Sequence, residues 1–226
     1  MKKFYLLLLL VISACTAKPD NVSILENSNC KLPCWNNITV GQTSKDEVLQ
    51  YIENSAGIDP KTIQITDDTS DVFDQRIFFS FRQGWIASQS PDLRVEIHLA
   101  DNVVGQLTIC GELNISINDI VNEVGEPQNI ISGDNLAGSR SVILINPQQG
   151  ISYTYDTDKL PDALKYEINP DIEIDCLDLF DPTLYTKLMD IGFFSSGHYN
   201  AEETLKVQYP WDGYGNLDEK YPPRQP

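Results

Sequence analysis

The feature that most constrains the fold is a helix-start pattern that occurs twice, 72 residues apart. In the first copy Ser44 can cap a helix, and Glu47 lies three residues later, where it can close a capping box. Apolar residues then recur on one helical face. The residues of the first face are Val48, Leu49 and Ile52, and the second copy contains Ser116, Asp119, Ile120, Val121 and Val124 in the same roles. The sequence therefore predicts two short amphipathic helices of equivalent design.

Runs of alternating β-branched and aromatic residues follow each predicted helix, and turn residues separate them. The runs are 77–81, 94–99 and 103–109 in the first unit, and 142–145, 151–155 and 172–180 in the second. Each unit is therefore expected to be a helix followed by an antiparallel meander of about three strands. Two such units bury their apolar sides best by joining sheets or packing face to face, which predicts an α+β fold. The alternative to two equivalent units is that the two segments of an ordinary α+β chain resemble each other by chance.

The segment 38–48 carries a family resemblance. It reads Ile-Thr-Val-Gly-Gln-Thr followed by Glu47-Val48, and it resembles the I-x-x-G-x-T-x-x-x-V opening of small outer-membrane lipoproteins of the SmpA/OmlA type. The segment Val124–Pro127 is similar to their L-G-x-P helix ending, in which the glycine adopts a left-handed conformation. The first unit lacks that ending, and the second lacks the opening glycine. Tandem units of this kind also form the β-lactamase inhibitory proteins, so the resemblance implies a fold suited to non-covalent binding.

The N-terminus is typical of an exported lipoprotein. Lys2 and Lys3 precede an apolar stretch at 5–12, which is far shorter than the ~20 residues of a spanning helix. The stretch ends in Ile12-Ser13-Ala14-Cys15, which resembles the lipobox of bacterial lipoproteins, although Ile12 stands where Leu is commonest. This resemblance implies cleavage before Cys15, acyl chains on Cys15 and a membrane-anchored ectodomain outside the cytoplasm. An ordinary secretory signal with a chance cysteine is the alternative.

Four cysteines remain once Cys15 is assigned to lipid, and an even number in an exported chain favours two disulfides. Three pairings are possible. We favour Cys30–Cys34, because only a short proline-containing loop separates these two cysteines, and Cys110–Cys176, because both lie late in strand-like runs. A zinc site at the C-x3-C spacing would need a second close pair of ligands, and His98 and His198 are solitary in sequence. The segment Cys30–Trp35 also looks like the start of uncharacterised bacterial lipoproteins that contain Pro-Cys-Trp.

The charge balance restricts the partners. The chain has 33 acidic and 16 basic side chains and a formal net charge of −17. This balance argues against nucleic acid, whose binding depends on Lys and Arg. It also opposes attraction to an anionic lipid surface, so the membrane contact is expected through the acyl chains on Cys15.

No catalytic motif stands out. The sequence contains no G-x-S-x-G, P-loop, H-E-x-x-H or dinucleotide fingerprint, so no cofactor and no enzymatic activity are expected. The acidic stretches at 67–74 and 156–158 lack the form of an EF-hand and are interpreted as solvated loops rather than metal sites. An envelope polymer hydrolase that uses two unassigned carboxylates is the alternative function.

The last 40 residues differ in character. Residues 184–191 are compatible with a short helix that ends at Gly192, and an irregular segment rich in Gly, Pro and aromatic residues follows. Tyr209, Trp211 and Tyr214 could form a binding platform for sugars or peptides. We favour the interpretation that they cover the edge of the core, since large aromatic side chains are mostly buried.

These observations predict a segmented chain. Its parts are a signal peptide (1–14), a lipid-anchored tether (15–29), a first α+β unit (30–110), a second unit (111–182) and a C-terminal helix with an irregular aromatic tail (183–226). The expected function is non-covalent binding of an envelope protein or glycan, or scaffolding of the envelope.

Overall fold

The computed structural model describes residues 30–81, 93–134, 140–162, 164–195 and 201–222. The predicted signal peptide, Cys15, the tether and His198 lie outside these residues. Within them, no helix is both long enough and apolar enough to cross a bilayer.

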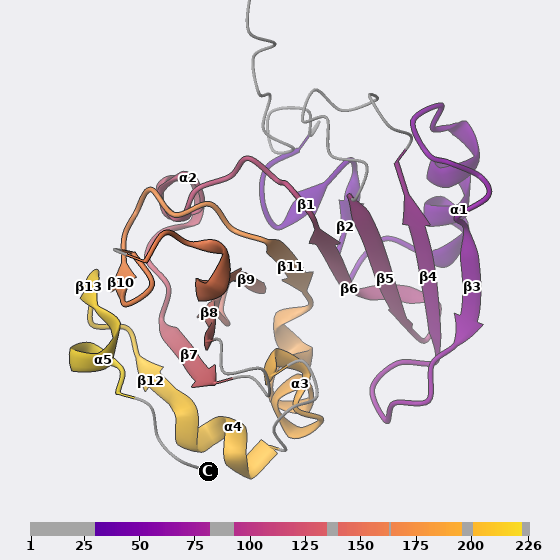
Figure 1. Cartoon of the computed structure of the whole chain (residues 1–226). Coiled ribbons are helices and arrows are strands. Elements are labelled where there is room, and N and C mark those ends of the chain that lie inside the picture. The colour runs from indigo at the N-terminus through magenta and orange to yellow at the C-terminus, as the bar shows by residue number, and fades with distance from the viewer. Residues whose placement is uncertain (1–29, 82–92, 135–139, 163, 196–200, 223–226) are drawn as a thin grey trace, which may run out of the picture.

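One continuous sheet of nine strands organises the molecule, and every neighbouring pair in it is antiparallel (Figure 1). From edge to edge its order is β12-β7-β8-β9-β11-β6-β5-β4-β3. The strands are β3 (Gln64–Asp67), β4 (Gln75–Ser80), β5 (Arg94–Ala100), β6 (Val103–Cys110), β7 (Asn129–Asp134), β8 (Arg140–Asn146), β9 (Ile151–Asp156), β11 (Cys176–Phe180) and β12 (Gln208–Pro210). The predicted fold class, a mixed protein with mostly antiparallel sheet, is confirmed at this level.

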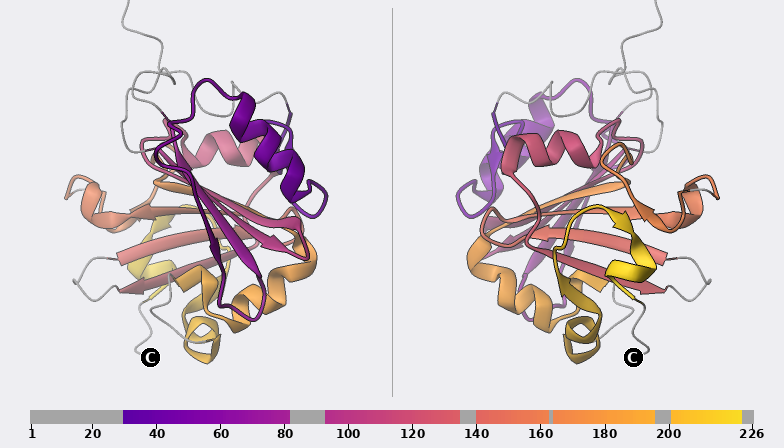
Figure 2. Two further views of the ribbon diagram at one scale, coloured as in Figure 1. Left: turned by 90° about the vertical axis from the view of Figure 1, so that its right-hand side faces the viewer. Right: turned by 90° about the vertical axis from the view of Figure 1, so that its left-hand side faces the viewer.

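Helices cover both faces of the sheet, with α1 and α2 on one side and α3 and α4 on the other (Figure 2). Two small two-stranded sheets, β1–β2 and β10–β13, add to the periphery. The bounds are α1 (Lys45–Asn54), α2 (Ile117–Val124), α3 (Tyr185–Asp190), α4 (Ala201–Val207), α5 (Leu217–Lys220), the 3-10 helices η1 (Thr157–Lys159), η2 (Pro182–Leu184) and η3 (Phe193–Ser195), and the strands β1 (Cys34–Trp35), β2 (Ile38–Thr39), β10 (Glu167–Ile168) and β13 (Gly215–Asn216).

Both predicted capping boxes are present. The Ser44 amide donates to Glu47 Oε2 at 2.7 Å, and the Glu47 amide donates back to Ser44 Oγ at 3.4 Å. The same exchange joins Ser116 and Asp119, at 2.8 Å and 3.2 Å. Each box satisfies two amide groups that a helix start otherwise leaves without partners, which explains why both helices begin there.

The predicted helix faces are buried, but less completely than expected. Val48 and Ile52 of α1 and Ile120 of α2 lie in the main core cluster. Leu49, Val121 and Val124 pack against this cluster and stay partly exposed, so the prediction that they are buried is wrong in degree. On the opposite face of the sheet, a second cluster joins Ile131, Ile143, Ile145 and Phe180 to residues of α3, η3 and α4.

The strand prediction is correct for six runs and misses others. The structure adds β3, β7 and β12 to the large sheet, so α1 is followed by four of its strands and α2 by five, of which β7, β8, β9 and β11 form a meander. All four residues of β3 are exposed, and such a strand shows no apolar alternation to detect. The predicted run at 172–180 forms a strand only from Cys176 onward.

The C-terminal tail is more regular than predicted. Its strand β12 pairs with β7 at the edge of the large sheet, and β13 pairs with β10. The helices α4 and α5 flank these strands along the chain. The free edge of β7 supplies hydrogen-bond partners that a local sequence pattern cannot reveal, so pairing with it orders a segment that looks irregular in sequence.

Candidate functional site

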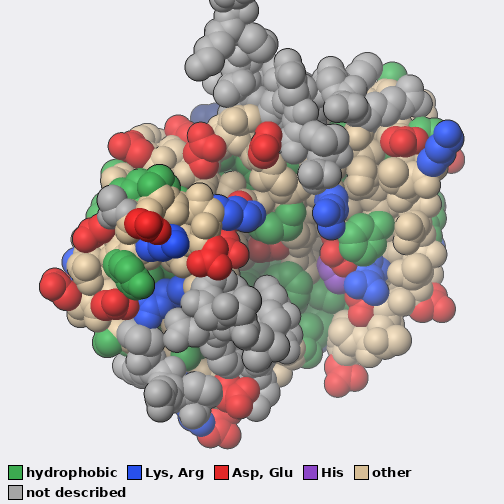
Figure 3. Space-filling model, in the orientation of Figure 1, with side chains coloured by type: hydrophobic (Ala, Val, Ile, Leu, Met, Phe, Trp, Pro, Cys, Tyr) green, Lys and Arg blue, Asp and Glu red, His purple; other side chains and the backbone are tan. Residues whose placement is uncertain are grey.

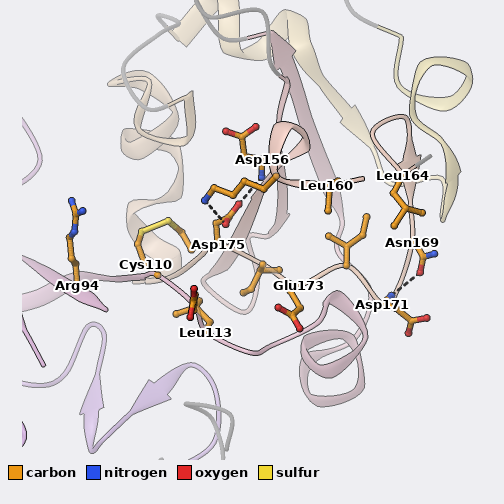
Figure 4. A pocket seen from close by; sticks show the side chains of 16 residues that line it. Arg94, Cys110, Leu113, Asp156, Leu160, Leu164, Asn169, Asp171, Glu173 and Asp175 are labelled. Atoms are coloured by element: carbon orange, nitrogen blue, oxygen red, sulfur yellow. Dashed lines mark hydrogen bonds and ion pairs between the residues drawn. A yellow bond between two sulfur atoms is a disulfide. The ribbon is translucent and has the colours of Figure 1, made fainter. Parts of the chain in front are cut away.

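A groove of about 800 Å³ opens where β6 ends and β11 begins (Figure 4). Its walls come from Gly111–Leu113 after β6, from Lys159 of η1 and from the loop 169–175 that leads into β11. The disulfide Cys110–Cys176 lines the groove, and these two cysteines pair directly across β6 and β11. The wall is therefore covalently fixed to the middle of the large sheet.

Both predicted disulfides are present. Cys30–Cys34 closes a sequence separation of 4 residues, and Cys110–Cys176 closes one of 66. Disulfides of this kind persist in oxidising environments, so they indicate an extracytoplasmic location. Because all four cysteines are bonded to one another, none of them is available as a zinc ligand.

The lining of the groove combines apolar and acidic side chains. Its apolar residues are Leu113, Leu160, Leu164, Ile172 and Ile174, of which Leu160 and Leu164 are only half-buried. Five acids, namely Glu112, Asp156, Asp171, Glu173 and Asp175, face two cations, Arg94 and Lys159. Red acidic groups are also spread widely over the face of the molecule shown in Figure 3. The groove is therefore suited to a ligand that is both partly apolar and positively charged.

One ion pair organises the groove. Lys159 Nζ lies 2.6 Å from Asp175 Oδ1, and the other oxygen of Asp175 accepts the backbone amide of Asp156 at 2.8 Å (Figure 4). The charge of Lys159 is therefore already matched by Asp175. This ion pair has no net charge. The four remaining acids outnumber the one remaining cation, Arg94, so the groove has a negative potential.

A buried carboxyl lies in the middle of β11, the strand that begins at the groove. Asp178 of β11 is 8% exposed and accepts hydrogen bonds from Thr108 Oγ1 at 2.6 Å, Ser152 Oγ at 3.1 Å and Gln106 Nε2 at 3.4 Å. Burial raises the pKa of Asp178, and these hydrogen bonds only partly oppose that effect. The sequence analysis did not single out Asp178, although a lone acid inside the apolar run Cys-Leu-Asp-Leu-Phe is the available signal.

Replacing Asp178 with asparagine should change the pH dependence of stability. Because the pKa of Asp178 is raised in the folded state, its contribution to stability is complete below the unfolded pKa of ~3.9 and is lost as pH rises through the folded value. The variant should therefore gain stability relative to the wild type between pH 4 and pH 8. Urea melts at both pH values measure this difference, and an unchanged or falling difference would contradict the assignment.

His98 is held between two carboxylates. Its Nδ1 lies 2.8 Å from Asp68 Oδ2, and its Nε2 lies 3.1 Å from Glu96 Oε1, which also contacts Arg76 at 3.3 Å. Burial tends to raise the pKa of Asp68 and of Glu96, but hydrogen bonds outweigh it and lower both values. These bonds come from the Ser70 amide and His98 to Asp68, and from His98 and Arg76 to Glu96. Both ring nitrogens of His98 are therefore occupied by contacts within the fold.

The two acidic stretches, predicted to be solvated loops, are loops only in part, because Asp67 ends β3, Asp156 ends β9, and the Asp68 side chain is largely buried. Asp68 accepts the Ser70 amide at 2.9 Å in addition to its contact with His98, and Asp156 accepts the Asp158 amide at 3.0 Å as the cap of η1. Among the described residues, no group of three His, Cys, Asp or Glu side chains could hold a metal ion.

The three aromatic residues singled out in the sequence come together around Tyr221. Tyr209 lies 6.0 Å from Tyr221 between ring centroids, and Trp211 stacks on Tyr221 at the same distance with an interplanar angle of 13°. Tyr214 meets Trp211 edge to face at 5.4 Å. All three residues also pack with the main core cluster, and Tyr209 is buried. None of them lines the groove.

No protein-family model matches this chain, and neither a curated protein nor a solved structure matches it. What can be said of its class therefore comes from its own fold and site. It is an α+β protein of an oxidising compartment with a nine-stranded antiparallel sheet and an open, acidic groove beside a cross-strand disulfide.

Proposed function

We propose that this chain is a binding protein of the cell envelope, anchored through acyl chains on Cys15, whose ligand is a basic and partly apolar segment of another envelope protein. The groove beside the Cys110–Cys176 disulfide carries this proposal. It has the size of a ligand site, its acids outnumber its cations, and its apolar residues offer burial to aliphatic side chains.

The alternative, a hydrolase with paired carboxylates, has less support from the geometry. General acids in such enzymes have a raised pKa. The pKa of Asp178 is raised, but this carboxyl is buried, satisfied by three hydrogen bonds and not part of the groove lining. Binding without turnover accounts better for an acidic groove of this kind.

The groove can be tested with a defined probe, a fluorescent peptide of alternating lysine and leucine. In full-length protein held in detergent, Glu173→Lys should weaken peptide binding about tenfold, which is a loss of about 1.4 kcal/mol. Glu53→Lys makes the same change of charge on α1, outside the groove, and should have little effect. Fluorescence anisotropy measures both affinities. Equal losses in the two variants would mean that the net charge, and not the groove, attracts the peptide.

The anchor is tested separately. Cys15→Ser should abolish incorporation of radiolabelled palmitate, because the thiol that receives the lipid is gone. Cys30→Ser is the matched control and should leave labelling intact, since Cys30 is bonded to Cys34 in the folded domain. Equal labelling of the Cys15→Ser variant and the wild type would rule out the lipoprotein assignment.

We also propose that the ectodomain consists of two related helix-and-meander units. Three observations support this: α1 and α2 both start at Ser-x-x-acid capping boxes, each is followed by a meander of four adjacent strands (β3–β6 after α1; β7, β8, β9 and β11 after α2), and the last strands of the two meanders, β6 and β11, pair with one another. A partner could then contact the join between the units, where the groove lies.

A further inference from the structure

The strand β3 forms one end of the nine-stranded sheet, and among the described residues its outer edge pairs with no other strand. All four of its residues are exposed, and its pairing with β4 is regular, without a bulge. The strand itself contains neither proline nor lysine, two residues that protect sheet edges from association. The opposite edge differs, because β12 is three residues long and includes Pro210.

An apolar row crosses the sheet and ends at this edge. Directly paired residues follow one another from β11 to β3 on the face that α1 and α2 cover: Leu179, Leu107, Ile97, Ile77 and Ile65. The first four side chains are buried with 0% exposure, whereas Ile65 is 47% exposed. The row therefore stops with an isoleucine whose outer side faces no described strand.

We propose that β3 pairs with β3 of a second copy of this chain, antiparallel about a two-fold axis, with Ile65 opposite its counterpart. This arrangement continues the apolar row from Ile77 through both Ile65 residues into the second sheet. It also satisfies the free backbone groups of both edges, as in other cases where an exposed edge gains a strand. The interface is isologous, so it closes at two copies and does not propagate.

Charges near the edge fit this occupant. Lys61 lies in the turn just before β3 and Asp67 ends the strand, so antiparallel pairing centred on Ile65 places the basic start of each β3 beside the acidic end of the other. The two-fold axis repeats this opposite-charge contact at the other end of the interface. These pairs oppose the repulsion that a formal net charge of −17 creates between two copies.

Cysteine cross-linking of the full-length protein in its membrane tests the proposal. Ile65→Cys should produce, under mild oxidation, a reductant-sensitive band at twice the monomer mass on a denaturing gel. Leu205→Cys is the control for mere exposure, because Leu205 is 60% exposed on α4, away from β3 (Figure 1). Gln64→Cys is the control for register, because Gln64 would face Thr66 of the other copy, and it should cross-link at most about a tenth as much.

The outcomes separate clearly. A strong dimer band for Ile65→Cys alone supports the pairing. An Ile65→Cys band no stronger than that of Leu205→Cys, or a band at the mass of a different protein, overturns the second copy as occupant. Equal bands for Gln64→Cys and Ile65→Cys overturn the register. As an independent readout, Ile65→Lys should reduce the sedimentation-equilibrium mass of the purified protein to that of one chain, and a mass equal to that of the wild type would overturn the role of Ile65.

Discussion

Replacement of Ile120 by aspartate is expected to unfold most of the protein at room temperature. Ile120 is fully buried on the inner face of α2, so the variant places an unpaired carboxylate in the main core. Such a burial costs several kcal/mol, a large part of a typical stability of ~5–15 kcal/mol. Val48→Asp should have an effect of the same size, because Val48 holds the corresponding position on α1 with 0% exposure. Urea melts followed by circular dichroism measure both losses.

Control substitutions on α2 distinguish the effect of burying a charge from the effect of placing an aspartate anywhere on the helix. Asn122→Asp lies on the exposed side of α2 and should change stability by no more than about 0.5 kcal/mol. Val121→Asp should cause a loss of stability between those of Ile120→Asp and Asn122→Asp, since Val121 is only partly buried. Equal, large losses at Val48 and Ile120 are expected if the two units are equivalent. A wild-type midpoint for either variant would show that its helix is a surface element, and the proposed repeat would then fail.

Removal of the Cys110–Cys176 disulfide, with serine at both positions, should lower the free energy of unfolding by about 4 kcal/mol, because the bond closes a long loop in the unfolded chain. The same double substitution at Cys30 and Cys34 should cost about 2 kcal/mol, since its loop is short. Urea melts of the two double variants measure the difference in unfolding free energy, with the midpoints compared at the same dependence of that free energy on urea concentration. A larger loss for the short loop than for the long one would contradict this ranking.

The sequence predicted those elements whose signals are local. The capping boxes at Ser44 and Ser116 set the helix starts through contacts three residues long, and both are present as expected. Strands with one apolar face, such as β5 and β6, were also recognised, because every second residue of the pattern faces a core. The disulfide pairing followed from spacing and strand context.

What could not be predicted depends on residues that are distant in sequence. The groove combines Gly111–Leu113, Lys159 and the loop 169–175, and only the pairing of β6 with β11 brings the first and last of these together. One of the two carboxylates that contact His98 belongs to Asp68, which lies outside the strand of His98 and 30 residues away in sequence. The edge strand β3 gave no periodic signal, since all four of its residues are exposed.

The cross-strand disulfide also determines how mechanical load passes through the molecule. A chain anchored at its N-terminus and pulled through its C-terminal end carries tension along the backbone as far as Cys110. There the covalent bond to Cys176 offers a direct route, so the tension bypasses the 66-residue separation between the two cysteines. The helix α2 and the strands β7, β8 and β9 lie inside this bypassed loop. Stretching can therefore peel away the elements before Cys110 and after Cys176, while the backbone of these three enclosed strands bears no tension.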